Sequence, residues 1–144
     1  MSIDIYSPDK DGYEVKHTFG AWRVAYLRYA ERFDRITYLE RHLETDEVFV
    51  LLQGKAVLLH GVNIEKTQME LNKIYNIPKG TWHNIKVSKD ALILIVENAD
   101  TSKPNSEYMP INTLMPLKLS AKLTRSRNLP IKHRLRLFSW GSLA

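Results

Sequence analysis

The sequence predicts an all-β protein folded as a sandwich or a jelly-roll barrel, and three observations lead to this prediction. Short stretches with the length and residue types of β-strands follow one another between residues 21 and 97. Residues typical of turns, above all glycine and proline, separate these stretches. No convincing amphipathic helix lies between them. This combination is typical of β-sandwiches and β-barrels.

The predicted strands cover residues 21–29, 36–42, 48–52, 56–60, 67–71, 74–77, 83–87 and 91–97. Most are bounded by turn residues, such as Gly54, Gly61 and the Pro78-Lys79-Gly80 segment. The runs at 48–52 and 91–96 are apolar at successive positions, so they are expected to be buried on both faces. Strands of this kind belong at the centre of a jelly roll.

Length and charge divide the chain into two parts. At 144 residues it suits one domain, which we assign to residues 1–113. The whole chain has a net charge of +5. Residues 114–144 carry seven Lys or Arg and no Asp or Glu, so the excess of positive charge belongs to this segment. We interpret this segment as a basic tail that is disordered or partly helical. It could touch nucleic acid by charge, pack on the barrel or a second subunit, or have no role. Nucleic acid is the least favoured, because the tail has no nucleic-acid motif with interleaved aromatic residues.

Composition excludes several kinds of site and location. The chain has no cysteine, so it has neither disulfides nor a thiolate metal site, and any metal must use carboxylates and the five histidines. The first residues lack the apolar run of a signal peptide, and no apolar stretch is long enough to cross a membrane. We therefore expect a cytoplasmic protein without a membrane partner.

Two clusters of polar residues could carry chemistry, at residues 40–47 and 78–83. Glu40 and His42 are two positions apart on a predicted strand, so their side chains face the same side. Glu47 opens the next strand, and the turn at Pro78-Lys79-Gly80 leads directly into the strand that begins with His83. Three strands could thus direct two imidazoles and one or two carboxylates to a common point. Such donors suit a divalent first-row transition metal.

The spacing of these residues resembles the two motifs of the cupin superfamily, G-x5-H-x-H-x(3,4)-E-x6-G and G-x5-P-x-G-x2-H-x3-N. Six of the ten marked positions match, and every spacing is kept. The corresponding segments are Asp34-x5-Glu40-x-His42-x4-Glu47-x6-Gly54 and Asn72-x5-Pro78-x-Gly80-x2-His83-x3-Val87. The resemblance covers roughly residues 20–100 and implies the double-stranded β-helix of a cupin barrel. Small cupins commonly form homodimers, so the resemblance also implies a homodimer.

The resemblance also implies that His42, Glu47 and His83 hold a divalent transition metal, such as Fe, Mn, Zn or Ni. Glu40 stands where the family has its first metal-binding histidine. It is therefore a fourth ligand, a general base beside the metal, or the mark of a cupin without metal. Asp34, Asn72 and Val87 replace residues at positions that are largely structural.

Several functions follow as hypotheses. The first is a metal-dependent enzyme acting on a small polar metabolite, as an oxygenase, isomerase or lyase, with Glu40 as the catalytic residue. The second is a non-enzymatic domain that binds or senses a small ligand. The third, weaker hypothesis is a nucleic-acid-associated protein acting through the tail. Four further polar residues lie on predicted strands and could line a cavity inside the barrel: Tyr26, Arg28, Tyr75 and Glu97.

Overall fold

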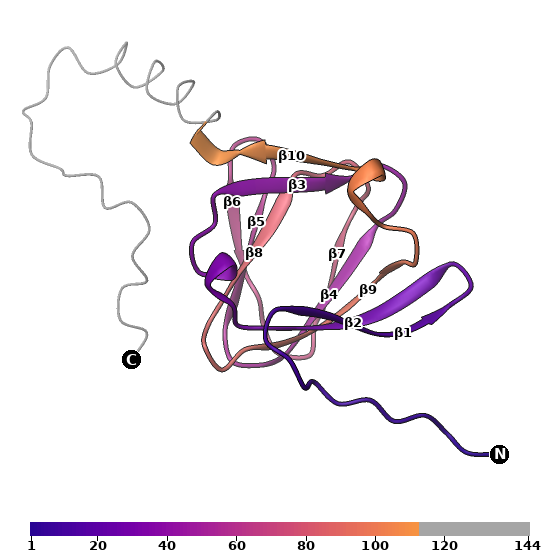
Figure 1. The fold of residues 1–144 in the computed structure, drawn as a ribbon. Coiled ribbons are helices and arrows are strands. Elements are labelled where there is room, and N and C mark those ends of the chain that lie inside the picture. The colour runs from indigo at the N-terminus through magenta and orange to yellow at the C-terminus, as the bar shows by residue number, and fades with distance from the viewer. Residues whose placement is uncertain (113–144) are drawn as a thin grey trace, which may run out of the picture.

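A computed structural model describes residues 1–112 and shows a barrel of two antiparallel sheets (Figure 1). The strands are β1 (Tyr13–Phe19), β2 (Trp22–Arg28), β3 (Tyr38–His42), β4 (Glu47–Gln53), β5 (Ala56–His60), β6 (Glu65–Gln68), β7 (Ile74–Ile77), β8 (His83–Val87), β9 (Leu92–Asn98) and β10 (Ser106–Pro110). One sheet has the order β1-β2-β9-β4-β7 and the other β10-β3-β8-β5-β6. The all-β prediction is confirmed, while the predicted tail at 114–144 lies outside the described residues.

Most predicted strands correspond closely to observed ones. The strands β2, β3, β4, β5, β7, β8 and β9 lie within two residues of their predicted bounds at either end. The strand predicted at residues 67–71 is placed differently, because β6 ends at Gln68. Two short 3-10 helices, η1 (Glu31–Phe33) and η2 (Lys103–Asn105), precede β3 and β10.

The prediction missed β1 and β10, and both are edge strands. Each has a single neighbour in its sheet, β2 for β1 and β3 for β10. An edge strand is covered less completely than a central one, so its residues need not follow a strict apolar alternation. β1 also shifts register between Val15 and His17, and β10 ends in Pro110, which suits only an edge position.

The two runs that are apolar at successive positions form central strands of one sheet. β9 lies between β2 and β4, and all three pair in antiparallel register. Phe49 and Leu51 on β4 and Ile93 and Ile95 on β9 are buried in the core. The opposite faces of both strands are only half-buried, so the expectation of burial on both sides was only partly right.

The interior of the barrel changes from apolar to polar along its strands. On β4 the inward residues pass from Leu51 and Phe49 to Glu47, and on β9 from Ile93 and Ile95 to Glu97. On β8 they pass from Val87 and Ile85 to His83. Because alternate residues share a face, each polar side chain points into the same interior as the core residues beside it. The polar residues therefore gather at one end of the barrel.

Within residues 1–112, a search for a helix of the length and apolar character needed to cross a membrane finds none.

Candidate metal site at the polar end of the barrel

Strand register brings the polar residues together from distant parts of the chain. Glu47 on β4 lies opposite Glu97 on β9, and Glu40 on β3 lies opposite His83 on β8. Directly opposed residues of antiparallel strands point to the same side of the sheet. The pairing of β3 with β10 adds Ser106 beside His42. Both sheets thus contribute to one polar cluster.

The three residues expected to hold a metal contact one another directly. His42 Nε2 lies 3.1 Å from Glu47 Oε2, and His83 Nε2 lies 2.9 Å from the same oxygen. The centroids of the two imidazole rings are 5.4 Å apart. All three residues are buried, and His83 is only 2% exposed. Two imidazole nitrogens therefore meet at one carboxylate oxygen inside the barrel.

The outer nitrogen of each imidazole has a partner of its own. His83 Nδ1 donates to the carbonyl oxygen of Thr81 at 2.8 Å, and His42 Nδ1 lies 2.8 Å from Ser106 Oγ. Bonds of this kind hold the orientation of a ring and, for His83, place a hydrogen on Nδ1. Both rings are thereby held with Nε2 directed at the cluster.

The contacts with Glu47 set the charges of the cluster. Burial alone disfavours the Glu47 carboxylate, but hydrogen bonds and positive charge from His42 and His83 outweigh it and lower the pKa of Glu47 to about 2. Burial lowers the pKa of His83, but the hydrogen bond and negative charge of Glu47 reverse that effect and raise it. Glu47 is thus an ionised carboxylate in a buried site.

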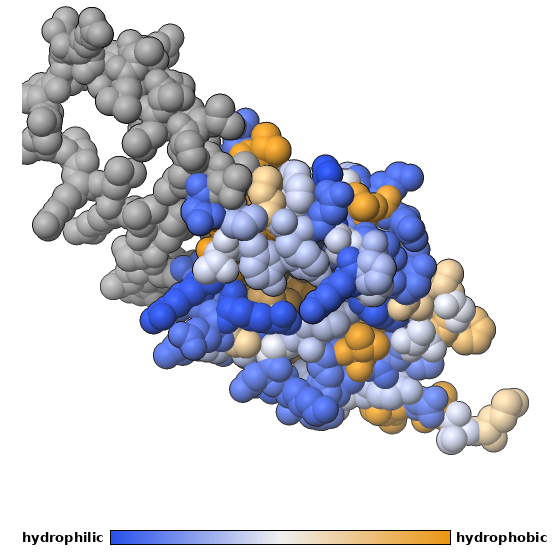
Figure 2. Space-filling view, turned by 45° about the horizontal axis from the view of Figure 1, so that its top comes forward, coloured by the Kyte–Doolittle hydropathy of each residue, from blue (hydrophilic) through white to orange (hydrophobic). Residues whose placement is uncertain are grey.

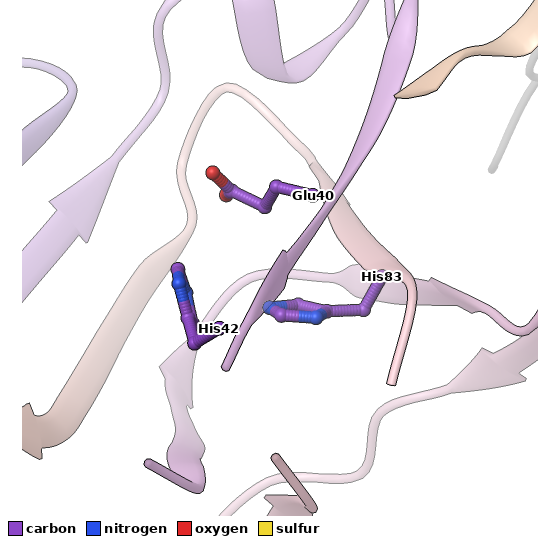
Figure 3. Close-up of side chains that lie close together, drawn as sticks. All are labelled: Glu40, His42 and His83. Atoms are coloured by element: carbon purple, nitrogen blue, oxygen red, sulfur yellow. The ribbon is translucent and has the colours of Figure 1, made fainter. Parts of the chain in front are cut away.

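Glu40 lies beside this cluster without sharing its hydrogen bonds. Figure 3 shows its carboxylate directed into the same space as the His42 and His83 rings. Burial, followed by the negative charge of Glu47, raises the pKa of Glu40. Within the described residues, no side chain or backbone group donates a hydrogen bond to its carboxylate. Glu40 is therefore held less tightly than Glu47.

The cluster lines a cavity of about 380 Å3. Figure 2 shows a face of the molecule with a hollow bordered by hydrophilic side chains. Glu97 lines the cavity, as the sequence indicated, but Tyr26, Arg28 and Tyr75 do not. Arg28 is exposed, Tyr26 borders a separate surface pocket, and Tyr75 packs against the apolar core. Their placement follows from strand parity, which was not assigned for these residues from the sequence.

Sequence reasoning missed two residues that hold Glu97 in place. Arg23 Nη2 donates to Glu97 Oε1 at 2.9 Å and Arg23 Nε to the same oxygen at 3.1 Å, while the Tyr13 hydroxyl also donates to it. Arg23 follows the parity of Ala25 and Leu27 on the predicted strand, so alternation could have identified it. Tyr13 gave no such signal, because β1 itself was not predicted.

The donor set suits a divalent first-row transition metal. Two groups of side chains bring one donor atom each to within 4.8 Å of one another, namely Glu40, His42 and His83, and His42, Glu47 and Glu97. Imidazole nitrogens and carboxylate oxygens bind Fe, Mn, Ni and Zn alike. The buried donors and the fixed outer nitrogens meet the requirements of such a site. The cluster could therefore bind a metal ion, and its chemistry does not select which one.

Comparison with known proteins identifies the fold. Neither a scan of protein-family models nor a search of curated sequences gives a match. Among solved structures, the Streptomyces protein Pac13 with uridine aligns over 76% of this chain and 93% of its own, with a TM-score of 0.57 and 10% identity. Pac13 is described as a nucleoside dehydratase.

Two further structures cover much of the chain. A protein from Planctomyces limnophilus aligns over 73% of this chain and 96% of its own, at a TM-score of 0.52 and 15% identity. A cupin-2 domain protein from Shewanella frigidimarina aligns over 60% and 79%, at a TM-score of 0.49 and 19% identity. Identities this low show a shared fold and carry no information about activity.

Proposed function

Because this chain has the cupin fold, we propose that it is a metal-dependent enzyme that acts on a small polar metabolite inside the barrel. One divalent transition metal would be held by His42, His83 and Glu47, with Glu40 beside it as the general base. The proposal depends on one observation above all. His42 Nε2 and His83 Nε2 converge on Glu47 Oε2 at 3.1 and 2.9 Å while their outer nitrogens are bonded elsewhere.

The chemistry follows from the charges around the cluster. A divalent ion held by His42, His83 and Glu47 would act as a Lewis acid toward a substrate oxygen. Carboxylate ligands reduce the net charge of such a centre, which weakens its power to generate hydroxide from water. The site therefore favours orienting and polarising an oxygen-rich substrate. Glu40 is the residue free to accept a proton from it.

The properties of Glu40 also favour some of the candidate reaction classes, namely isomerase, lyase and oxygenase, over others. Isomerases and lyases commonly begin by removing a proton, and the half-buried Glu40 carboxylate, with a raised pKa and no hydrogen-bond donor, suits that step. The oxygen-transfer step of an oxygenase does not itself require such a base. We therefore favour isomerase or lyase chemistry over oxygenase chemistry.

The first prediction concerns metal content. Protein purified without chelator is expected to contain close to one equivalent of a transition metal, because the buried donors meet at one centre. Elemental analysis by mass spectrometry measures this directly. Dialysis against a chelator, followed by addition of Fe, Mn, Zn or Ni in turn, identifies the metal that restores the stability of the untreated protein. Protein that takes up none of these metals would contradict the proposal.

The second prediction concerns Glu40. The Glu40→Gln variant is expected to keep its metal and lose catalysis by about 100-fold or more, because the amide cannot accept the proton. Glu107→Gln is a suitable control, since Glu107 is an exposed carboxylate on β10 that pairs with Arg41 outside the cavity. Metal lost together with activity in Glu40→Gln would instead make Glu40 a ligand.

A homodimer and a cytoplasmic location stay predictions from the sequence. Gel filtration of the full chain measures the first, and fractionation of cells the second.

A further inference from the structure

The charged side chains around the cavity are separated by sign. Its carboxylates, Glu40, Glu47 and Glu97, are largely buried, whereas Arg32 and Lys103 are exposed on η1 and η2. All five line the same cavity. The interior of the cavity is thus acidic and its exposed edge carries two cations from different segments.

These two cations have no carboxylate partner within residues 1–112. Three arginines and three lysines form ion pairs with carboxylates in this part of the chain, and neither Arg32 nor Lys103 is among them. Arg23, the other cation that lines the cavity, is already neutralised by Glu97. The guanidinium of Arg32 lies 4.3 Å from the centroid of the Phe33 ring, which is buried. Arg32 is therefore supported by an aromatic face while its hydrogen-bond donors stay available.

A third residue independently indicates a ligand. Thr101 lines the cavity and is only 7% exposed, yet its Oγ1 has no hydrogen-bond partner. A buried hydroxyl without a partner is unfavourable, and such a group in a native structure calls for an explanation. A ligand oxygen in the cavity would provide the missing hydrogen bond. Thr101 is two residues from Lys103, so both belong to the segment that joins β9 to β10.

We propose that the substrate carries an anionic group, a carboxylate or a phosphate ester, which Arg32 and Lys103 bind at the edge of the cavity. The Thr101 hydroxyl would form a hydrogen bond with an uncharged oxygen elsewhere in the substrate. This inference deepens the proposed function and rests on it, because the polar remainder of the substrate would extend toward Glu40 and the metal. A cavity of about 380 Å3 is large enough for a sugar acid or a sugar phosphate. The charge of the anion complements the cationic edge, and its hydroxyl groups complement the acidic interior.

The experiment uses the full chain and three matched probes: glucose, glucuronate and glucose 6-phosphate. Isothermal titration calorimetry gives the dissociation constant of each. We expect at least one anionic probe to bind at least about tenfold more tightly than glucose, since hydrogen bonds to charged groups are the stronger ones. A preference for glucuronate identifies a carboxylate, and a preference for glucose 6-phosphate identifies a phosphate ester. Equal affinities for all three, or no binding of either anion, would overturn the inference.

Substitutions of Arg32 and Lys103 test whether these two residues bind the anion. Arg32→Gln and Lys103→Gln are each expected to weaken the preferred anion about tenfold, with little effect on glucose. Arg35→Gln and Lys89→Gln are matched controls, because both residues are exposed and neither lines the cavity. An Arg32→Gln, Lys103→Gln double variant with wild-type affinity would reject the assigned edge.

Thr101→Val separates recognition from folding. Valine has nearly the shape of threonine and removes a hydroxyl that bonds nothing in the protein, so the melting temperature is expected to stay the same or rise. Affinity for the preferred anion is expected to fall several-fold. A variant that binds the anion like the wild type would remove Thr101 from the inference.

Metal analysis of the same samples distinguishes the two proposals. Protein that binds metal but does not prefer the anionic probes keeps the proposed function and rejects this inference. Protein that prefers the anionic probes but takes up no metal keeps the anion-binding site and rejects the proposed metal-dependent function.

Discussion

The His83→Ala variant is expected to lose metal affinity by far more than the roughly 10- to 100-fold that removal of an outer partner of a ligand causes. His83 supplies a buried imidazole whose Nε2 lies 2.9 Å from Glu47 Oε2. Alanine removes that donor atom. It also leaves the ionised Glu47 carboxylate with His42 as its one remaining imidazole partner. Elemental analysis of the purified variant, together with titration of added metal, measures the loss.

His42→Ala is expected to give the same result, because His42 contributes the second imidazole nitrogen of the cluster. His60→Ala is the matched control. His60 lies directly opposite His83 in the pairing of β5 with β8, but its Nε2 bonds Thr67 Oγ1 and it does not line the cavity. His60→Ala should therefore keep its metal. If His83→Ala does not fold, His83→Gln is the substitute, because glutamine is of similar size and lacks an imidazole. Metal retained in the His42 and His83 variants would contradict the proposed centre.

The Gly54→Ala variant is expected to lose about 2–4 kcal/mol of its free energy of unfolding. Gly54 lies in the turn between β4 and β5 with a φ of 75°, in the region that side chains other than glycine rarely adopt. A Cβ there would stand 2.7 Å from Ala91 Cα and 2.8 Å from Ser88 Oγ. The backbone of Ala91 cannot move aside without disturbing the start of β9. Chemical denaturation followed by circular dichroism measures the change.

Two other glycines allow the cost of the backbone conformation to be measured apart from the cost of the close contact with Ala91. Gly20 and Gly61 also have positive φ, but a Cβ at either would meet nothing within 4 Å. Gly20→Ala and Gly61→Ala are therefore expected to lose only about 1 kcal/mol, which is the cost of the left-handed conformation. If Gly54→Ala were no less stable than these variants, the close approach of Ala91 would not matter to folding.

One departure from the cupin motifs is explained by the structure. Asn72 stands where the second motif begins with glycine, and its φ is 62°. Asparagine is among the residues that tolerate this region best. The replacement therefore keeps the turn before β7. The motif glycines Gly54 and Gly80 have positive φ as well, so the spacing of the motifs reflects the turns that the barrel requires.

The central strands and the residues most suited to chemistry could be predicted from the amino-acid sequence. Alternation and turn residues are local properties, so they identified β4, β5, β8 and β9 closely. The motif spacing likewise singled out His42, Glu47 and His83, which the structure brings together. The edge strands β1 and β10 were not predicted. Each has a neighbouring strand on one side alone and is covered less completely, so its residues need not follow a regular apolar alternation.

The further residues that line the cavity could not be predicted from the sequence and became known from the folded barrel. Glu97 lies opposite Glu47 although fifty positions separate them in the chain, and Thr101 and Arg32 reach the same cavity from separate connecting segments. Alternation tells which side of a strand a residue occupies, but not which residue of another strand it faces. That pairing depends on register between distant segments, and register is set by the packing of the whole barrel.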